Sequence, residues 1–257
     1  MSAARRTPVV LLHALSLDAS MWDAQRRALQ AIGHPVIAPD QRGFGSVPLG
    51  EEPPSLDVVA DDLARTLDRV GAGPVLLAGS SMGAYTAMAF VRRHPGRTAG
   101  LALLSARTTA DSPEARAGRL QFAELIRDDQ ARPALIARTT PMLVGATTRA
   151  RRPEVVDRLL ADAAKADPAA LAWAQRAVAD RPDATETLRA ADVPAVVIAG
   201  AQDELVTPQE TRHTAALLRR GRLVTLPGAG HLQPLETPER VTRELLALLD
   251  EIGTPAC

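Results

Sequence analysis

Aromatic side chains and cysteine are both scarce in this 257-residue sequence. Phe, Trp and Tyr together make up 2% of the chain, which argues against a surface that stacks nucleobases or sugars. The single cysteine, Cys257, is the last residue, and one thiol cannot form an internal disulfide. We therefore expect neither a disulfide-based secreted fold nor a cysteine metal site, and we interpret Cys257 as a surface thiol.

An excess of charge of one sign is also missing. The sequence has 30 basic and 30 acidic residues, a formal net charge of +0, and no long run of either sign. Proteins that bind nucleic acid or anionic membranes usually carry a basic excess, so we expect neither partner.

Long apolar segments are absent as well, since no stretch of 18 apolar residues occurs. The apolar run at residues 9–12 follows two arginines, but His13 and Asp18 interrupt it and no signal-peptide cleavage site follows. We expect this run to be a strand, no segment to cross a membrane, and the protein to be cytoplasmic.

What the sequence does contain is an alternation of short apolar runs with helical patterns. The runs are apolar on both sides, as in strands buried between two layers of helices. The expected strands are 8–13, 35–39, 74–80, 99–105, 194–200 and 222–227. The expected helices are about 19–31, 55–72, 82–94, 208–220 and 238–252, several of them with cap residues such as Ser55 and Thr207. This alternation predicts the α/β class, a doubly wound and mostly parallel sheet with helices on both faces.

Residues 107–182 interrupt the alternation, because they contain helical patterns but no convincing strand. The clearest helical runs begin near Pro113, Pro153 and Pro168. We predict a core made of residues 1–106 and 183–257, with 107–182 inserted as a helical cap. Ligands of open α/β sheets bind at the carboxyl edge of the strands, so a cap there would shape a pocket.

The pentapeptide Gly79-Ser80-Ser81-Met82-Gly83 matches G-x-S-x-G, the nucleophile elbow. Alone the pattern is weak, since it arises by chance in roughly one chain in ten of this length. Its context strengthens it, because a buried strand is expected directly before it and an amphipathic helix directly after it. The register favours Ser81 as the nucleophile and leaves Ser80 a structural role.

A serine hydroxyl needs a base within hydrogen-bond reach, and that base needs an acid to orient it. His231 lies in the loop after the last expected strand, where no structural demand for an imidazole is evident. Asp203 follows the strand at 194–200. Its alternative role is to begin the turn before the next helix, and Glu204 is the rival carboxylate. The chain order Ser81, Asp203, His231 is the order that this arrangement requires, so we predict these three as the catalytic residues.

Two backbone N–H groups are needed to stabilise the oxyanion that forms during acyl transfer. We assign them to Met82, directly after the nucleophile, and to Leu15, in the loop after the first strand. The substrate pocket is expected to involve six large side chains, each of which has an alternative place in the core. These residues are Trp22, Tyr85, Phe122, Met142, Leu143 and Trp173.

Five segments together resemble the single-domain α/β-hydrolase superfamily over nearly the whole chain. They are LLHALSLDASMW, APDQRGFG, AGSSMG, AGAQDELVTP and PGAGHLQPLETPE. The run Met21-Trp22-Asp23 is similar to the branch that contains 3-oxoadipate enol-lactonases and small carboxylesterases. The resemblance implies a serine hydrolase without metal or other cofactor that acts on esters or lactones, with an oxyanion donor at the position of Leu15.

The chain departs from this superfamily at two points. Most members have His-Gly before the oxyanion loop, whereas this chain has His13-Ala14, so we expect a slightly altered loop that His13 braces. Most members also begin with an antiparallel hairpin, but only seven residues precede the first strand here. We therefore predict six parallel strands without that hairpin, a short start that plant methyl esterases and hydroxynitrile lyases share.

These observations predict a hydrolase that cleaves a small-molecule carboxylic ester or lactone through an acyl-enzyme, as a monomer or homodimer. Three alternatives use the same fold: a cofactor-free haloperoxidase or perhydrolase, a hydroxynitrile-lyase-like enzyme, and a non-catalytic ligand receptor. The scarcity of aromatic residues and the many aliphatic ones favour a small or medium apolar acyl group. The lack of a basic cluster in the sequence argues against a highly anionic substrate.

Overall fold

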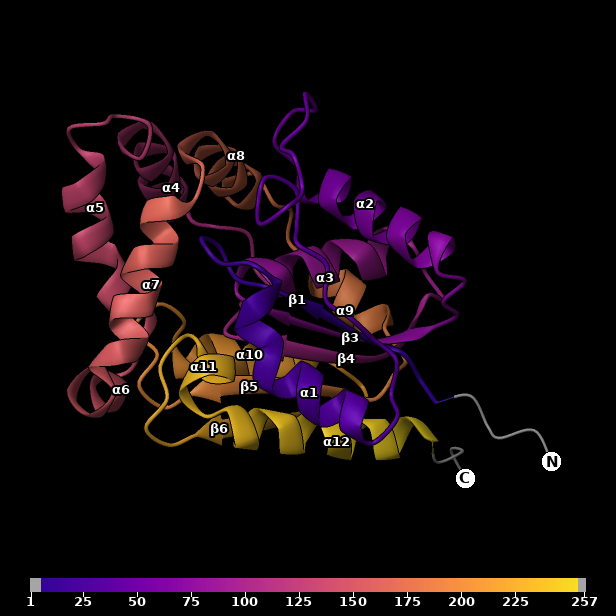
Figure 1. Ribbon diagram of the computed structural model, residues 1–257. Helices are drawn as coiled ribbons and strands as arrows, with labels where there is room; N and C mark the ends of the chain where they lie inside the picture. Colours follow the sequence, from indigo (N-terminus) through magenta and orange to yellow (C-terminus); the bar gives the residue numbers. More distant parts are fainter. Residues whose placement is uncertain (1–5, 254–257) are drawn as a thin grey trace.

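A six-stranded parallel sheet forms the centre of the molecule in the computed structural model, which describes residues 6–253 (Figure 1). Cys257 and its expected place at the surface lie outside the described residues. The strands are β1 (Val9–Leu12), β2 (Val36–Ile37), β3 (Val75–Ser80), β4 (Thr98–Leu104), β5 (Ala195–Gly200) and β6 (Gly221–Leu226). They pair in the order β2-β1-β3-β4-β5-β6, and every neighbouring pair is parallel. No hairpin precedes β1 within residues 6–253, so the prediction of six parallel strands is confirmed.

Alternate residues of each strand point to opposite faces of the sheet, and each face has its own core. Val10 and Leu77 belong to the core on the side of α2 and α3, whereas Leu11 and Ala78 belong to the core on the side of α1 and α12. All four side chains are fully buried, which explains why the strands are apolar on both sides. The core helices are η1 (Ala19–Trp22), α1 (Asp23–Ala31), α2 (Leu56–Arg69), α3 (Met82–Arg93), α9 (Thr185–Ala190), α10 (Pro208–Leu217), α11 (Gln233–Glu236) and α12 (Pro238–Gly253).

Helix starts follow the cap residues in the sequence. The Ser55 side chain accepts a hydrogen bond from the Asp57 backbone N–H at 3.1 Å and begins α2. Thr207 and Glu210 form a reciprocal capping box at the start of α10. Helix ends were predicted less well, since α2 and α10 each end three residues before the expected position. The short helices α9 and α11 were not predicted, because four to six residues carry no periodic pattern.

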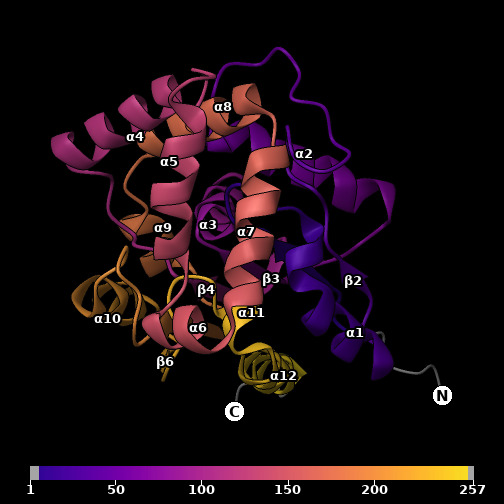
Figure 2. The same cartoon turned by 60° about the vertical axis from the view of Figure 1, so that its left-hand side comes forward.

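The segment 107–182 is helical throughout its regular parts and lies over the carboxyl ends of the strands (Figure 2). Its elements are α4 (Pro113–Leu125), α5 (Arg132–Thr139), η2 (Thr140–Leu143), α6 (Ala146–Arg151), α7 (Pro153–Lys165) and α8 (Pro168–Ala179). The starts of α4, α7 and α8 agree with the expected positions, while α5, η2 and α6 were not predicted. The division of the chain into a core and a cap domain stays a prediction.

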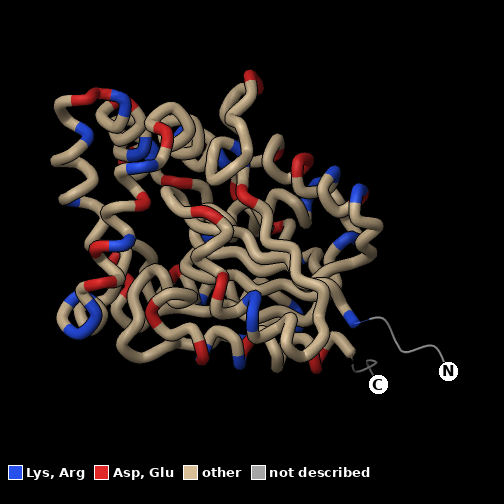
Figure 3. The backbone as a smooth tube through the Cα atoms, viewed as in Figure 1, with Lys and Arg blue, Asp and Glu red and all other residues tan. Residues whose placement is uncertain are grey.

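Charged residues of both signs are interspersed along the backbone (Figure 3). No helix within residues 6–253 is long and apolar enough to span a membrane.

Candidate active site

Ser81 lies on the sharp turn between β3 and α3, with a backbone φ of 52° and ψ of −114°. A positive φ is strained for a residue with a side chain, and here it turns Ser81 out of the sheet. The backbone segments approach each other closely at this turn, and the turn is possible only because glycines occupy the two crowded positions. A Cβ added to Gly79 would lie 2.2 Å from the Gly83 carbonyl oxygen, and one added to Gly83 would lie 2.2 Å from the Leu12 carbonyl oxygen. The neighbouring Ser80 is fully buried in β3.

His231 and Asp203 lie in line with the Ser81 hydroxyl. The Ser81 Oγ is 2.8 Å from His231 Nε2, and His231 Nδ1 is 3.0 Å from each carboxylate oxygen of Asp203. Because a carboxylate only accepts hydrogen bonds, this geometry favours the tautomer with the proton on Nδ1. Nε2 is then free to accept the Ser81 proton. One line of hydrogen bonds thus joins Ser81 to His231, 150 positions later in the chain, and His231 to Asp203.

Asp203 is held by more than His231. Its Oδ1 accepts hydrogen bonds from the backbone N–H groups of Leu205 at 2.9 Å and Val206 at 3.1 Å. Burial would raise the pKa of the Asp203 carboxyl, but the hydrogen bond and charge of His231, together with the other donors, lower it overall. Glu204, the rival carboxylate, is exposed and pairs with Arg149 at 2.7 Å. The geometry therefore favours Asp203.

Ser105 is a further partner of Asp203 that the sequence analysis missed. It follows the last residue of β4, is fully buried, and has a positive φ of 50°. Its Oγ is 2.8 Å from Asp203 Oδ2 and accepts a hydrogen bond from Gln233 Nε2 at 2.6 Å. Since Asp203 can only accept, the Ser105 hydroxyl donates to it. A serine at the end of the strand next to the nucleophile strand was the only signal available in the sequence.

Glu236 holds the His231 loop from the other side. This buried carboxylate accepts from the backbone N–H groups of Gly230 at 2.9 Å and Leu232 at 3.1 Å, the two neighbours of His231. Its second oxygen accepts from Gly145 N–H at 2.8 Å and from the Thr148 hydroxyl at 2.7 Å, at the start of α6. Glu236 thus ties the residues around His231 to the helical segment above the sheet.

His13 braces the loop after β1, as the sequence analysis expected. Its Nδ1 is 2.9 Å from the Ala14 carbonyl oxygen and its Nε2 accepts from the Gln41 N–H at 2.8 Å. Complete burial is the main cause that lowers the pKa of His13, and the hydrogen bond to Ala14 opposes it. Both ring nitrogens are occupied, so His13 is not available as a second base.

A cavity of about 380 Å³ opens onto Ser81 and His231. Most of its wall is aliphatic, supplied by residues of the helical segment and of the loops after β1 and β5. Six residues predicted for the oxyanion hole or the pocket line this cavity. They are Leu15, Met82, Tyr85, Phe122, Met142 and Leu143. Met82 is the first residue of α3, where backbone N–H groups have no partner inside the helix.

Trp22 and Trp173, which were expected at the pocket, are not among the residues that line this cavity. Trp22 is fully buried in the core on the α1 and α12 side of the sheet. Trp173 belongs to the opposite core, and its Nε1–H donates to the Glu52 carbonyl oxygen at 2.8 Å. Both indoles fix helices to the body of the protein, the alternative that the sequence had left open.

Two arginines and a glutamine that the sequence did not point to also line the cavity: Arg107, Arg119 and Gln175. Arg107 follows β4, Arg119 lies on α4 and Gln175 lies on α8. They are far apart in sequence, so no local pattern pointed to them. Within residues 6–253, no group of three His, Cys, Asp or Glu side chains is arranged to hold a metal ion.

The sequence profile of the family described as alpha/beta hydrolase fold matches residues 7–238. A solved structure of a thermophilic esterase from Thermogutta terrifontis, with malate bound, is 37% identical with a TM-score of 0.91, and the match covers 96% of this chain and 91% of that chain. The enol-lactonase from Burkholderia xenovorans LB400 is 26% identical with a TM-score of 0.86, over 98% of this chain and 94% of that chain. A bifunctional esterase/perhydrolase from Acinetobacter calcoaceticus is 24% identical over 95% of this chain and 92% of its own length.

Proposed function

The chain belongs to the α/β-hydrolase fold family, and from this membership we propose that it hydrolyses carboxylic esters or lactones through an acyl-enzyme on Ser81. The observation that carries the proposal is the line of hydrogen bonds from Ser81 Oγ through the His231 imidazole to Asp203. Such a line activates a hydroxyl that is otherwise a poor nucleophile at neutral pH. Ser81 and His231 line a largely aliphatic cavity, which supports a small organic substrate.

In the proposed reaction the Ser81 oxygen attacks the carbonyl carbon while its proton moves to His231 Nε2. Asp203, ionised because its pKa is lowered, stabilises the imidazolium that forms. The backbone N–H groups of Leu15 and Met82 are the proposed donors to the oxyanion. The alcohol leaves with the proton from His231. Water then attacks the acyl-enzyme with His231 as the base, and the acid is released.

The nature of the relatives supports ester or lactone substrates. The solved relatives include an esterase and an enol-lactonase that match nearly the whole chain. The proposed chemistry needs only protein side chains and water, without metal or other cofactor. We further propose that the substrate is a small-molecule ester or lactone, and that the protein acts in the cytoplasm as a monomer or homodimer.

Perhydrolysis is a second candidate activity of the same site. One relative over nearly the whole chain is a bifunctional esterase/perhydrolase. If hydrogen peroxide instead of water attacks the acyl-enzyme, the product is a peracid, and the residues that form the acyl-enzyme are unchanged. Peracid formation from acetate and peroxide, measured by bromide oxidation, would support this second activity.

The proposed hydrolysis is tested with p-nitrophenyl esters and two neighbouring serine variants. Ser81→Ala should lower kcat by about 10⁴-fold or more, because the nucleophile is lost. Ser80→Ala is the matched control, since Ser80 is fully buried and its Oγ has no hydrogen-bond partner within residues 6–253. Activity should persist in Ser80→Ala. Full activity in a folded Ser81→Ala protein would contradict the proposal.

A further inference from the structure

Two arginines at one end of the active-site cavity are only partly paired by the protein. Arg107 donates through Nη1 to Glu210 at 2.8 Å and through Nη2 to the Leu205 carbonyl oxygen at 3.5 Å, and its buried Nε–H has no partner within residues 6–253. Arg119 donates through Nε to Asp111 at 2.6 Å and through Nη1 to the Gln175 side chain at 3.1 Å. Both side chains are about one fifth to one quarter exposed, at 21% and 24%. Each guanidinium therefore has N–H groups that the hydrogen bonds named here do not use, and both residues line the cavity.

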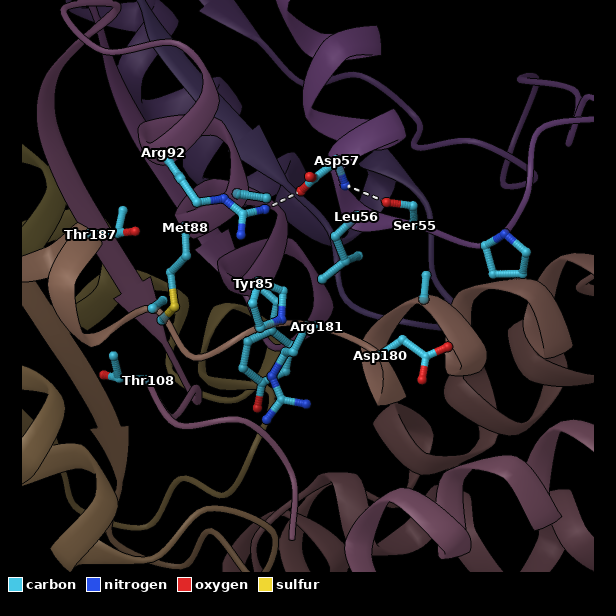
Figure 4. Close-up of a pocket in the computed structure, with 15 residues that line it drawn as sticks. Ser55, Leu56, Asp57, Tyr85, Met88, Arg92, Thr108, Asp180, Arg181 and Thr187 are labelled. Atoms are coloured by element: carbon cyan, nitrogen blue, oxygen red, sulfur yellow. Dashed lines mark hydrogen bonds and ion pairs between the residues drawn. The ribbon is translucent and has the colours of Figure 1, made fainter. Parts of the chain in front are cut away.

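Asp111 is shared with a third arginine. Arg181 donates to Asp111 at 2.7 Å and to the Val178 carbonyl oxygen at 2.9 Å. Its guanidinium also lies 4.2 Å from the centre of the Tyr85 ring. Figure 4 shows Arg181 beside Tyr85 in a neighbouring cavity of about 190 Å³, and Tyr85 lines both cavities. Arg119 and Arg181 therefore share the single negative charge of Asp111.

Counting the charges at this end leaves one positive charge in excess. Three guanidinium groups, Arg107, Arg119 and Arg181, face two carboxylates, Asp111 and Glu210. The adjoining pairs Arg116–Asp180 and Arg176–Glu124 are balanced. The negative charge of Asp203 is not counted at this end, because Asp203 does not line the cavity and its carboxylate faces His231.

We propose that the substrate carries a single negative charge, a carboxylate away from the scissile carbonyl, which Arg107 and Arg119 bind at this end of the cavity. This inference rests on the proposed ester or lactone hydrolysis and names its substrate class. A guanidinium presents paired N–H donors that match a carboxylate, and a largely apolar cavity strengthens the attraction. No local pattern in the sequence indicates this site, because the arginines come from the β4–α4 loop, α4 and the segment after α8.

The test compares esters that differ only by a terminal carboxylate. Monomethyl adipate and methyl hexanoate have acyl chains of equal length, and 6-acetoxyhexanoate and hexyl acetate have alcohol parts of equal length. Proton release at neutral pH gives kcat/KM for each. We expect the charged member of at least one pair to be favoured by about 10- to 100-fold, the range for a hydrogen bond to a charged group. The preference should shrink as ionic strength rises.

Arginine variants then assign the preference to this site. Arg107→Gln and Arg119→Gln should each lower the ratio of charged to neutral kcat/KM toward one, while turnover of the neutral ester persists. Arg107→Lys, which keeps the charge but loses the paired donors, should retain part of the ratio. Arg116→Gln is the matched control, because Arg116 lies on α4 like Arg119 but is exposed, pairs with Asp180 and does not line the cavity.

The outcomes separate this inference from the proposed function. Hydrolysis that depends on Ser81 but shows no preference for either charged ester, or a preference that both glutamine variants retain, would overturn the inference alone. If no ester is turned over, calorimetry on the Ser81→Ala protein still decides it. Monomethyl adipate should then bind at least about tenfold more tightly than methyl hexanoate, and adding Arg107→Gln or Arg119→Gln should abolish this difference in affinity. Equal binding of the two would contradict the inference.

Discussion

Removing the Ser105 hydroxyl tests whether the support of Asp203 contributes to the reaction. In Ser105→Ala, Asp203 Oδ2 loses the hydrogen bond of 2.8 Å, and Gln233 Nε2 keeps only the Gly230 carbonyl oxygen at 2.6 Å. A hydrogen bond to a charged group contributes about 1.5–3 kcal/mol. If all of it were felt in the transition state, kcat/KM would fall by about 10- to 150-fold. Because Leu205 and Val206 still donate to Asp203, we expect the lower end, roughly tenfold.

Ser105→Gly separates this effect from backbone strain. Both variants lack the hydroxyl, but only glycine relieves the positive φ of 50° at this position. Urea unfolding should therefore show Ser105→Gly to be more stable than Ser105→Ala by about 1 kcal/mol. Steady-state kinetics on one ester should show the same loss of kcat/KM in both. Wild-type kcat/KM in Ser105→Ala would refute a positioning role, and equal stability of the two variants would refute the strain at Ser105.

Three further changes have defined outcomes. Asp203→Asn should lower kcat by about 10³- to 10⁴-fold by favouring the wrong His231 tautomer. The pKa of Asp203 is lowered in the folded protein, so its ionised form stabilises the fold at neutral pH, and this stabilisation is lost as the pH falls through the folded-state pKa. The difference in unfolding free energy between the wild type and Asp203→Asn should therefore shrink below about pH 4, as measured by urea titrations. Gly83→Ala should lower the free energy of unfolding by about 1–3 kcal/mol, because the added Cβ would overlap the Leu12 backbone. Gly118→Ala is the control: an added Cβ at this exposed position of α4 meets nothing within 4 Å, so this variant should be neutral or stabilising. Glu236→Gln should lower kcat and increase hydrogen exchange at Gly230, because an amide NH₂ cannot accept the bonds that the carboxylate accepts; unchanged kcat would leave Glu236 with a purely structural role.

The sequence predicted the line of Ser81, His231 and Asp203 because each residue follows a recognisable strand. A parallel sheet brings the carboxyl ends of its strands to one edge, so residues in the loops after β3, β5 and β6 meet there. The elbow motif and the chain order then select among the candidates. The same reasoning predicted the brace at His13 and led to the assignment of Leu15 as a proposed oxyanion donor, since both residues lie just after the end of β1.

The residues that hold Asp203 and the His231 loop in place could not be predicted from local sequence patterns. Ser105 reaches Asp203, and Glu236 reaches Gly145 and Thr148, through hydrogen bonds between residues about 90 or more positions apart in the sequence, and no periodicity marks such contacts. The arginine cluster was missed for the same reason, because its members are dispersed between residues 107 and 181. Trp22 illustrates the opposite limit: a large apolar side chain fits a core and a pocket equally well, and only packing decides between them.

Covalent capture of the acylated residue tests the central claim most directly. The protein is treated with a fluorophosphonate, and the modified peptide is identified by mass spectrometry after proteolysis. We predict one adduct per chain, on Ser81, that forms in Ser80→Ala but not in Ser81→Ala, and whose formation stops ester turnover in parallel. An adduct on another residue, or ester turnover that continues after Ser81 is fully modified, would contradict the account.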